Sequence, residues 1–202
     1  MTAEDLYTAL LDRLTPQAVG WLDETIALVA TDPAALPRRH PAAGRRCGRG
    51  PLGVGAWTVD DAARTLMISA VRLPVADLLA VVTGLYFQGD AAERRAVLRA
   101  LEFLDLGDGA LPLVRDALRT NDTRLVAAAL GPYGGLHLDH AAWRDAVLKC
   151  LFVGVPLAGV TDLPRRTDAE LVRMVRDFAR ERRAAGRPVP ADARLICDIE
   201  EN

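Results

Sequence analysis

The sequence is short of lysine, cysteine and aromatic residues. Lys149 is the only lysine among 25 basic residues, and aromatic residues make up 5% of the chain. So few rings leave little surface on which nucleic-acid bases could stack, and a net charge of −2 also argues against a nucleic-acid partner. The three cysteines, Cys47, Cys150 and Cys197, are odd in number and far apart, which indicates neither a disulfide framework nor a CxxC metal site.

Long apolar runs are also missing. The most apolar segments are residues 150–160, interrupted by Gly154 and Pro156, and residues 75–87, interrupted by Asp77. Both are shorter than the roughly 20 residues that a helix needs to span a bilayer. The acidic N-terminus lacks the basic start of a signal peptide. We therefore expect no transmembrane segment and, because so few cysteines suit a reducing compartment, a cytoplasmic location.

Alternation of apolar and polar residues, the mark of a half-buried β-strand, is absent as well. Apolar residues recur instead every three to four positions along most of the chain. Capping signals such as Asp90-Ala91-Ala92-Glu93 and Thr167-Asp168-Ala169-Glu170 mark where helices should begin. A chain of 202 residues that is 50% hydrophobic suits one globular domain. We predict an all-α fold of about nine helices in a single domain, residues 1–202.

Two segments of the chain resemble each other. Residues 93–101 and 122–130 share an acid, Arg, Val, Ala and Leu in register, at an offset of 29 residues (93 to 122). That offset corresponds to about one helical hairpin and is typical of stacked helix pairs. The repeat predicts a right-handed stack of antiparallel helix pairs, a HEAT-like α-α superhelix.

Residues 33–57 are rich in arginine, proline and glycine. Four prolines and five glycines predict a loop. The segment carries a group of basic residues and no acid: Arg38, Arg39, His40, Arg45, Arg46 and Arg49. These side chains could contact an anion or an acidic partner, or they could simply be solvated on a mobile loop.

Three polar side chains fall where predicted helices meet: Arg119, Asn121 and Tyr133. Tyr133 lies within Gly131-Pro132-Tyr133-Gly134-Gly135, which is typical of a tight corner. The three could bind anionic or hydroxyl groups of a ligand. Alternatively, Asn121 caps the next helix and Arg119 pairs with a carboxylate.

His137, Asp139 and His140, with Cys150 further along, are ligand types that zinc prefers. Their spacing does not support a metal site, because His137 precedes the predicted helix while His140 lies in its first turn. Asp139 is better explained as the helix cap. Cys150 belongs to an apolar stripe at helical spacing, composed of Trp143, Ala146, Val147, Cys150 and Leu151. We therefore predict no metal.

Lys149 has two interpretations. It could be a reactive amine if it were buried, or it could pair with Asp145 one turn earlier on the helix surface. Cys150 beside it lacks an identifiable base that would make it a nucleophile. The sequence contains no phosphate loop, GxSxG or HExxH motif, so we predict no catalytic residue and no cofactor. The candidate ligand-binding residues are Arg119, Asn121, Tyr133, His137, Trp143 and Lys149.

Residues 75–190 resemble the EboA family. The resemblance rests on Arg119-Thr120-Asn121, Pro132-Tyr133, Trp143, Val147-Leu148-Lys149, Phe152, Gly154, Arg166, Glu170-Leu171 and Ala184-Ala185-Gly186-Arg187. The chain departs from the family at Gly131 and Gly134, where Asn and Pro are common. It departs again at Arg144-Asp145, where an Asn-Gln pair is typical.

The resemblance implies a protein of a bacterial or algal gene cluster associated with secondary metabolites. Such clusters also encode proteins that resemble a prenyltransferase, a sugar-phosphate isomerase, a TatD-like hydrolase and a dehydroquinate synthase. They are linked to moving or processing a metabolite precursor at the cell envelope. Implied partners are therefore proteins of the same cluster and a small-molecule metabolite, and a peripheral position at the inner membrane becomes an alternative to a purely cytoplasmic one.

Two functions follow as expectations. The first is a non-enzymatic helical-repeat adaptor or small-molecule-binding protein, because stacked helix pairs form concave binding surfaces and no complete catalytic set is present. The alternative is an enzyme, or a subunit of one, that acts on a prenyl or sugar-derived intermediate. Its site would lie at the corner near Arg119, Tyr133 and Lys149.

Overall fold

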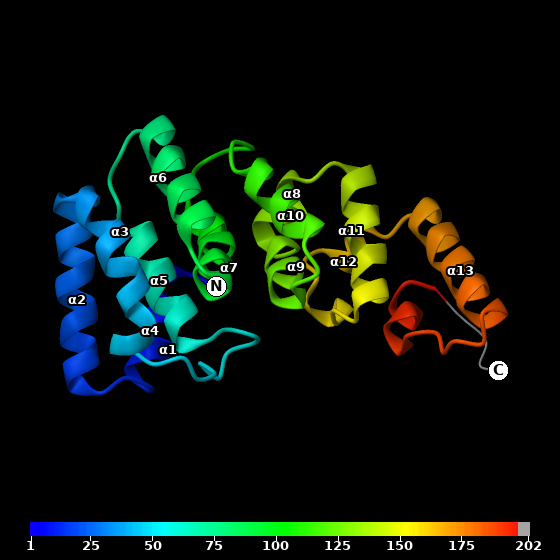
Figure 1. The fold of residues 1–202 in the computed structure, drawn as a ribbon, viewed down its shortest axis with the longest axis horizontal. Helices are drawn as coiled ribbons and strands as arrows, with labels where there is room; N and C mark the ends of the chain where they lie inside the picture. The colour runs from blue at the N-terminus through cyan, green and yellow to red at the C-terminus, as the bar shows by residue number, and fades with distance from the viewer. Residues whose placement is uncertain (198–202) are drawn as a thin grey trace. The chain divides into compact units, whose positions relative to one another are not determined.

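The fold is all-helical. The computed structural model describes residues 1–197, and within that range it contains no β-strand, only an isolated bridge between Pro51 and Thr58. The prediction of an all-α protein is thus confirmed. The chain divides into two compact units, Met1–Leu113 and Val114–Asn202, and Figure 1 labels their α-helices.

Helix α5 is the centre of the first unit. The elements are α1 (Ala3–Leu11), α2 (Pro16–Thr31), η1 (Pro33–Ala35), α3 (Leu36–Arg39), η2 (His40–Ala42), α4 (Ala43–Arg46), α5 (Val59–Ser69), α6 (Val75–Gln88), α7 (Ala91–Ala100) and η3 (Leu101–Phe103), where η denotes a 3₁₀ helix. Helices α1, α2, α4 and α7 all contact α5, and α6 packs on α7. Every residue from Val59 to Ile68 is buried, so α5 has almost no face toward solvent.

Helix α11 is the centre of the second unit. Helix α8 (Leu111–Arg119) begins in the first unit and ends in the second, and the later elements are α9 (Thr123–Ala129), α10 (Pro132–His137), α11 (His140–Val153), η4 (Leu157–Gly159), α12 (Leu163–Arg166), α13 (Ala169–Ala184) and η5 (Ala191–Leu195). Helix α11 contacts α9, α13 and η4. Its predicted apolar stripe is confirmed, because all five residues from Trp143 to Leu151 in that stripe are buried.

The helices begin where short polar side chains cap them. Asp90 and Glu93 form a complete capping box at α7, with each side chain accepting a hydrogen bond from the other residue's backbone N–H. Asp139 accepts from the backbone of Ala142 at α11 over 2.8 Å. At α13 the predicted box is wrong by one residue, because Asp168 rather than Thr167 is the cap.

The corner at residues 131–135 is a short helix rather than an irregular turn. Proline occupies the first position of α10, where its missing N–H costs nothing. A Cβ atom at Gly134 would lie 1.9 Å from the carbonyl oxygen of Ala129. Glycine is therefore required there so that α10 can lie against the end of α9.

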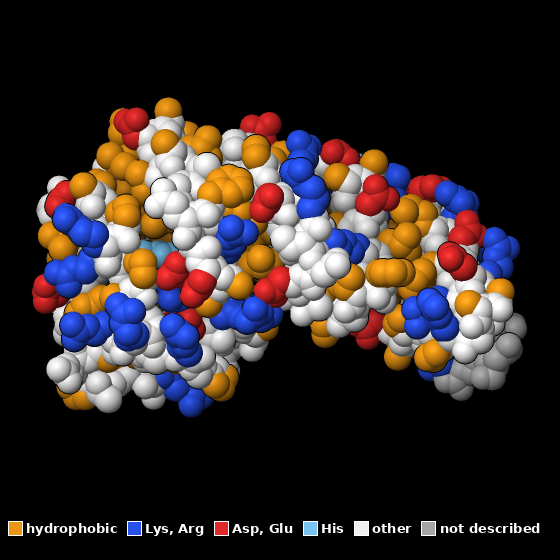
Figure 2. All heavy atoms as spheres, viewed as in Figure 1, with side chains coloured by type: hydrophobic (Ala, Val, Ile, Leu, Met, Phe, Trp, Pro, Cys, Tyr) orange, Lys and Arg blue, Asp and Glu red, His pale blue; other side chains and the backbone are white. Residues whose placement is uncertain are grey.

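Residues 33–57, expected as a loop, are partly helical. The first half folds into the one-turn elements η1, α3, η2 and α4. Prolines occur in η1, α3 and η2, always at the first or second position, where a helix tolerates them. These one-turn helices, together with α10 (Pro132–His137) and α12 (Leu163–Arg166), explain why the expected count of about nine helices is not confirmed. Arg39 pairs with Glu24 over 3.2 Å, whereas Arg38, Arg45, Arg46 and Arg49 are exposed. Figure 2 shows basic side chains gathered over this part of the first unit.

Arginines from elsewhere in the first unit hold this segment by its backbone. Arg13, in the turn after α1, donates from Nε to the carbonyl oxygen of Leu52 over 3.0 Å. Arg99 of α7 donates to the carbonyl oxygen of Ala56 over 2.9 Å. Arg64 of α5 donates from Nε to the carbonyl oxygen of His40 over 3.2 Å. The segment is thus attached to the helices that surround it at three separate carbonyls.

Candidate functional site

Two of the six candidate residues, Arg119 and Lys149, line one hollow in the second unit. The hollow has a volume of about 350 Å³ and lies between the end of α8 and one face of α11. Helix α11 contributes positions 142, 145, 146 and 149, which follow the i, i+3, i+4, i+7 spacing of a single helix face. The regular spacing of α11 therefore gathers these side chains.

The hollow combines positive charge with an apolar floor. Its cationic side chains are Arg115, Arg119 and Lys149, its acid is Asp145, and its apolar side chains are Leu118, Leu138, Ala142 and Ala146. A concave surface with a few convergent polar groups over apolar residues is the usual form of a small-molecule site. Three cations against one acid favour an anionic ligand.

Lys149 binds the backbone of α8. Its Nζ donates to the carbonyl oxygen of Leu118 over 2.7 Å, in the last turn of α8, where carbonyls lack partners within the helix. The negative end of the helix dipole also favours a cation there. The predicted pair with Asp145 is therefore wrong, because the carbonyl offers the ammonium group a partner that helical spacing could not reveal.

The two arginines of the hollow are exposed. Arg119 donates from Nε to the carbonyl oxygen of Arg115 over 3.3 Å. The guanidinium of Arg115 lies 3.8 Å from the carboxylate of Asp139. Arg119 therefore pairs with no carboxylate that the structure records, and its guanidinium can face an incoming anion.

Asn121, Tyr133 and His137 do not line this hollow. Asn121 is exposed between α8 and α9, and it does not cap α9, because Asp122 accepts the capping bond from the backbone of Arg124. Tyr133 is buried, and its ring lies 4.4 Å from that of His137. The structure therefore brings these two rings together, but neither of them lines the hollow that contains the cationic side chains. A ligand role for the three stays a prediction.

Trp143 is part of the core, and Arg166 holds it there. Trp143 is fully buried, and the guanidinium of Arg166 lies 4.8 Å from its ring centroid. Arg166 also donates to the carbonyl oxygens of Gly135 and Leu138, the latter over 2.8 Å. Sequence reasoning gave Arg166 no physical role, since its partners lie 31 and 28 residues away.

Replacing Arg166 with leucine should lower the free energy of unfolding by about 2–3 kcal/mol, because two buried carbonyls lose a charged donor. Urea denaturation followed by circular dichroism measures the change. Arg165→Leu is the matched control: Arg165 is exposed and pairs with Asp162 at the surface, so its loss should cost less than about 1 kcal/mol. Equal losses in the two variants would contradict the anchoring role.

Cys150 is a buried and unreactive thiol. Burial raises the pKa of the Cys150 thiol to about 12, so the thiol stays protonated at neutral pH and is a poor nucleophile.

Among residues 1–197, no three or more His, Cys, Asp or Glu side chains are grouped to hold a metal ion. The same part of the chain has no helix both long and apolar enough to cross a membrane.

A buried charge cluster in the first unit was missed by the sequence reasoning. Asp60 and Asp61, in the first turn of α5, are both buried. Asp60 pairs with Arg64 over 2.6 Å, and Asp61 lies 2.8 Å from Arg95 and 3.4 Å from Arg99. The i,i+4 spacing of Asp60 and Arg64 could have suggested the first pair.

The cluster combines two carboxylates with three guanidinium groups. Burial raises the pKa of Asp61 above its ordinary value, and the positive charges of Arg95 and Arg99 oppose that shift. The Thr58 hydroxyl donates to Asp60 over 2.7 Å and accepts from Arg95 over 3.1 Å. Both carboxylates of the cluster pair with arginines, so removing one partner would leave an uncompensated buried charge.

Comparison with known proteins adds one result. A family model described as Metabolite traffic protein EboA matches residues 46–196. This range contains the whole hollow between α8 and α11. No curated protein and no solved structure matches the chain.

Proposed function

The chain belongs to the EboA family, and from this premise we propose that it binds a small anionic metabolite without transforming it. The observation that carries the proposal is the hollow between α8 and α11. There, Arg115, Arg119 and Lys149 surround an apolar floor. Cations at the rim suit a phosphate or carboxylate, and the floor suits an apolar portion of the same molecule.

The geometry gives less support to an enzyme. An enzyme at this corner would need Arg119, Tyr133 and Lys149 to face one substrate, as any set of catalytic groups must. Tyr133 instead packs on His137 and does not line the hollow that contains Arg119 and Lys149. Cys150, the nearest nucleophile type, is buried and protonated. Binding without catalysis requires only cationic groups beside an apolar concave surface, and the hollow has both.

The wider setting of the protein follows as part of the same proposal. We infer that the helices stack as HEAT-like pairs and that residues 1–202 act as one domain. The contacts of α11 with both α9 and α13 suit such a stack. The metabolite would be a precursor in secondary metabolism, handled together with enzymes of the same gene cluster. The place of action would be the cytoplasm or the inner face of the membrane.

Geranyl diphosphate is a suitable probe of the hollow, because it joins an anionic group to an apolar chain. Isothermal titration calorimetry should show saturable binding. Arg119→Gln and Lys149→Gln should each weaken it by roughly 10-fold, the effect of losing one hydrogen bond to a charged group. Inorganic pyrophosphate, which lacks the apolar chain, should bind more weakly than geranyl diphosphate.

Arg176→Gln is the matched control, because Arg176 is an exposed arginine of α13 outside the hollow. Its affinity should equal that of the unmodified protein. Thermal unfolding of each variant checks that the fold is intact. Affinities of Arg119→Gln and Lys149→Gln that match the control would refute binding in this hollow, and conversion of the probe to a product would favour the enzyme.

A further inference from the structure

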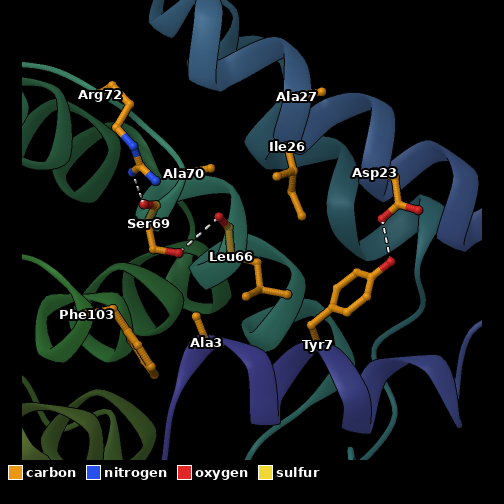
Figure 3. Close-up of a pocket in the computed structure, with 10 residues that line it drawn as sticks. All are labelled: Ala3, Tyr7, Asp23, Ile26, Ala27, Leu66, Ser69, Ala70, Arg72 and Phe103. Carbon is orange, nitrogen blue, oxygen red and sulfur yellow. Dashed lines mark hydrogen bonds between the residues drawn. The ribbon is translucent and has the colours of Figure 1, made fainter.

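We propose that the first unit contains a second ligand site, formed by α1, α2 and the end of α5, which takes an apolar molecule carrying one anionic group. The site is a hollow of about 670 Å³ (Figure 3). This volume falls within the range of about 300–1,000 Å³ typical of small-molecule pockets. The proposal is independent of the metabolite site between α8 and α11.

The floor of the hollow is apolar. It is formed by Ala3, Ile26, Ala27, Leu66, Ala70 and Phe103. Helices α1 and α2 each pack on α5, but three of these floor residues are alanines, whose side chains are too short to fill the space between the helices. Ile26 and Phe103 remain partly exposed beside it. An apolar ligand would remove this surface from water, which is favourable.

Arg72 provides a positive group at one edge of the hollow. Its Nη1 donates to the carbonyl oxygens of Ser69 over 2.9 Å and Val71 over 3.4 Å. These bonds hold the guanidinium beside the hollow (Figure 3). A guanidinium has five N–H donors, and Nε and Nη2 take no part in the two bonds. They remain suited to a carboxylate, sulfonate or phosphate.

Asp23 and Tyr7 define another edge. The hydroxyl of Tyr7 donates to Asp23 over 2.8 Å, so the tyrosine ring is held along the wall of the hollow (Figure 3). The carboxylate of Asp23 disfavours a second anion on this side and can accept a hydrogen bond from a ligand hydroxyl or amine. The two edges therefore select a molecule with a single anionic group, placed at Arg72.

Half of this hollow comes from outside the part of the chain that matches the family. Ala3, Tyr7, Asp23, Ile26 and Ala27 precede residue 46, where the match begins. The N-terminal helices thus complete a site that the matched segment alone does not form. The hollow between α8 and α11, by contrast, lies wholly within the matched range.

Two fluorescent probes with the same rings test the proposal. 8-Anilinonaphthalene-1-sulfonate carries a sulfonate, and N-phenyl-1-naphthylamine is its uncharged counterpart. Arg72→Gln should weaken binding of the sulfonate by roughly 10-fold, because a charge-assisted bond is lost. It should leave the affinity for the neutral probe unchanged. Arg38→Gln is the control for charge, since Arg38 is exposed and does not line the hollow.

A substitution that fills the hollow tests its location. Ala27 is exposed on α2 and lines the hollow, and leucine is nearly as good a helix former as alanine, so Ala27→Leu should fold normally. It should abolish saturable binding of both probes. Ala80→Leu makes the same change at an exposed position of α6 outside the hollow and should have no effect. Thermal unfolding of every variant is measured alongside.

The outcomes separate the two hollows. Weaker binding of the sulfonate probe alone in Arg72→Gln, with loss of both probes in Ala27→Leu, supports the proposal. Unchanged binding in Ala27→Leu overturns it, as does an equal effect of Arg72→Gln and Arg38→Gln. Loss of binding in Lys149→Gln would place the probe between α8 and α11 and would also overturn it. Failure of geranyl diphosphate to bind would count only against the metabolite site.

Discussion

Replacing Asp60 with alanine should lower the free energy of unfolding by about 3–5 kcal/mol, the usual cost of removing one partner of a buried ion pair. The side chains of Arg64 and Asp60 are only 1% and 2% exposed. Without Asp60, the guanidinium of Arg64 would keep just its bond to the carbonyl oxygen of His40. A buried, uncompensated charge on the central helix α5 would therefore destabilise the whole first unit. Urea denaturation at pH 7 measures the loss.

Two further variants separate the buried charge from a general loss of packing. In the double variant Asp60→Ala/Arg64→Leu the guanidinium is also absent, so the double variant should be more stable than Asp60→Ala alone. Asp77→Ala removes an exposed carboxylate from the first turn of α6 and should cost less than about 1 kcal/mol. A double variant less stable than the single one would show that the unpaired arginine is not the cause.

Acid should destabilise the protein through His40. Burial, together with the positive charge of Arg64, lowers the pKa of His40 to about 3. The unfolded chain binds a proton near pH 6.5 while the folded chain does not. The stability contributed by neutral His40 is therefore fully present above pH 6.5 and is lost as the pH falls toward 3. At pH 4 the loss should be about 3 kcal/mol, at about 1.4 kcal/mol per pH unit.

Comparison with His40→Phe isolates this contribution, since phenylalanine keeps a ring of similar shape and cannot be protonated. Buried Nε2 of His40 has no hydrogen-bond partner within the described part of the chain, so the replacement breaks no bond at that atom. Unfolding free energies of both proteins are measured between pH 7 and pH 4. His137 and His140 are present in both and cancel in the difference. Parallel pH profiles would show that His40 does not govern the acid response.

Local features of the fold could be predicted from the sequence. Caps such as Asp90 and Asp139 were identified because a cap depends on residues within one turn of it. The buried face of α11 was identified because its apolar spacing is regular. The one-turn helices of residues 36–46 were not, because proline and glycine are equally compatible with a loop and with the first turn of a helix.

Long-range polar contacts could not be predicted. Arg95 and Asp61 are 34 residues apart in sequence, and nothing near either residue indicates the other. Lys149 contacts a backbone carbonyl 31 residues away. Every residue has such a carbonyl, so the sequence does not indicate which one Lys149 will contact. Of the candidate site residues, Arg119 and Lys149 line one hollow, whereas Tyr133 and Trp143 contact His137 and Arg166.

The backbone bonds from Arg13, Arg64 and Arg99 have a consequence for how the first unit can evolve. They hold residues 40–56 by carbonyl oxygens, which are present whatever side chain the residue carries. We therefore expect the exposed side chains of this stretch to vary between orthologues while the path of its backbone stays the same. Because Arg13, Arg64 and Arg99 hold the backbone of this stretch in place, these three positions should tolerate far less variation than the stretch itself.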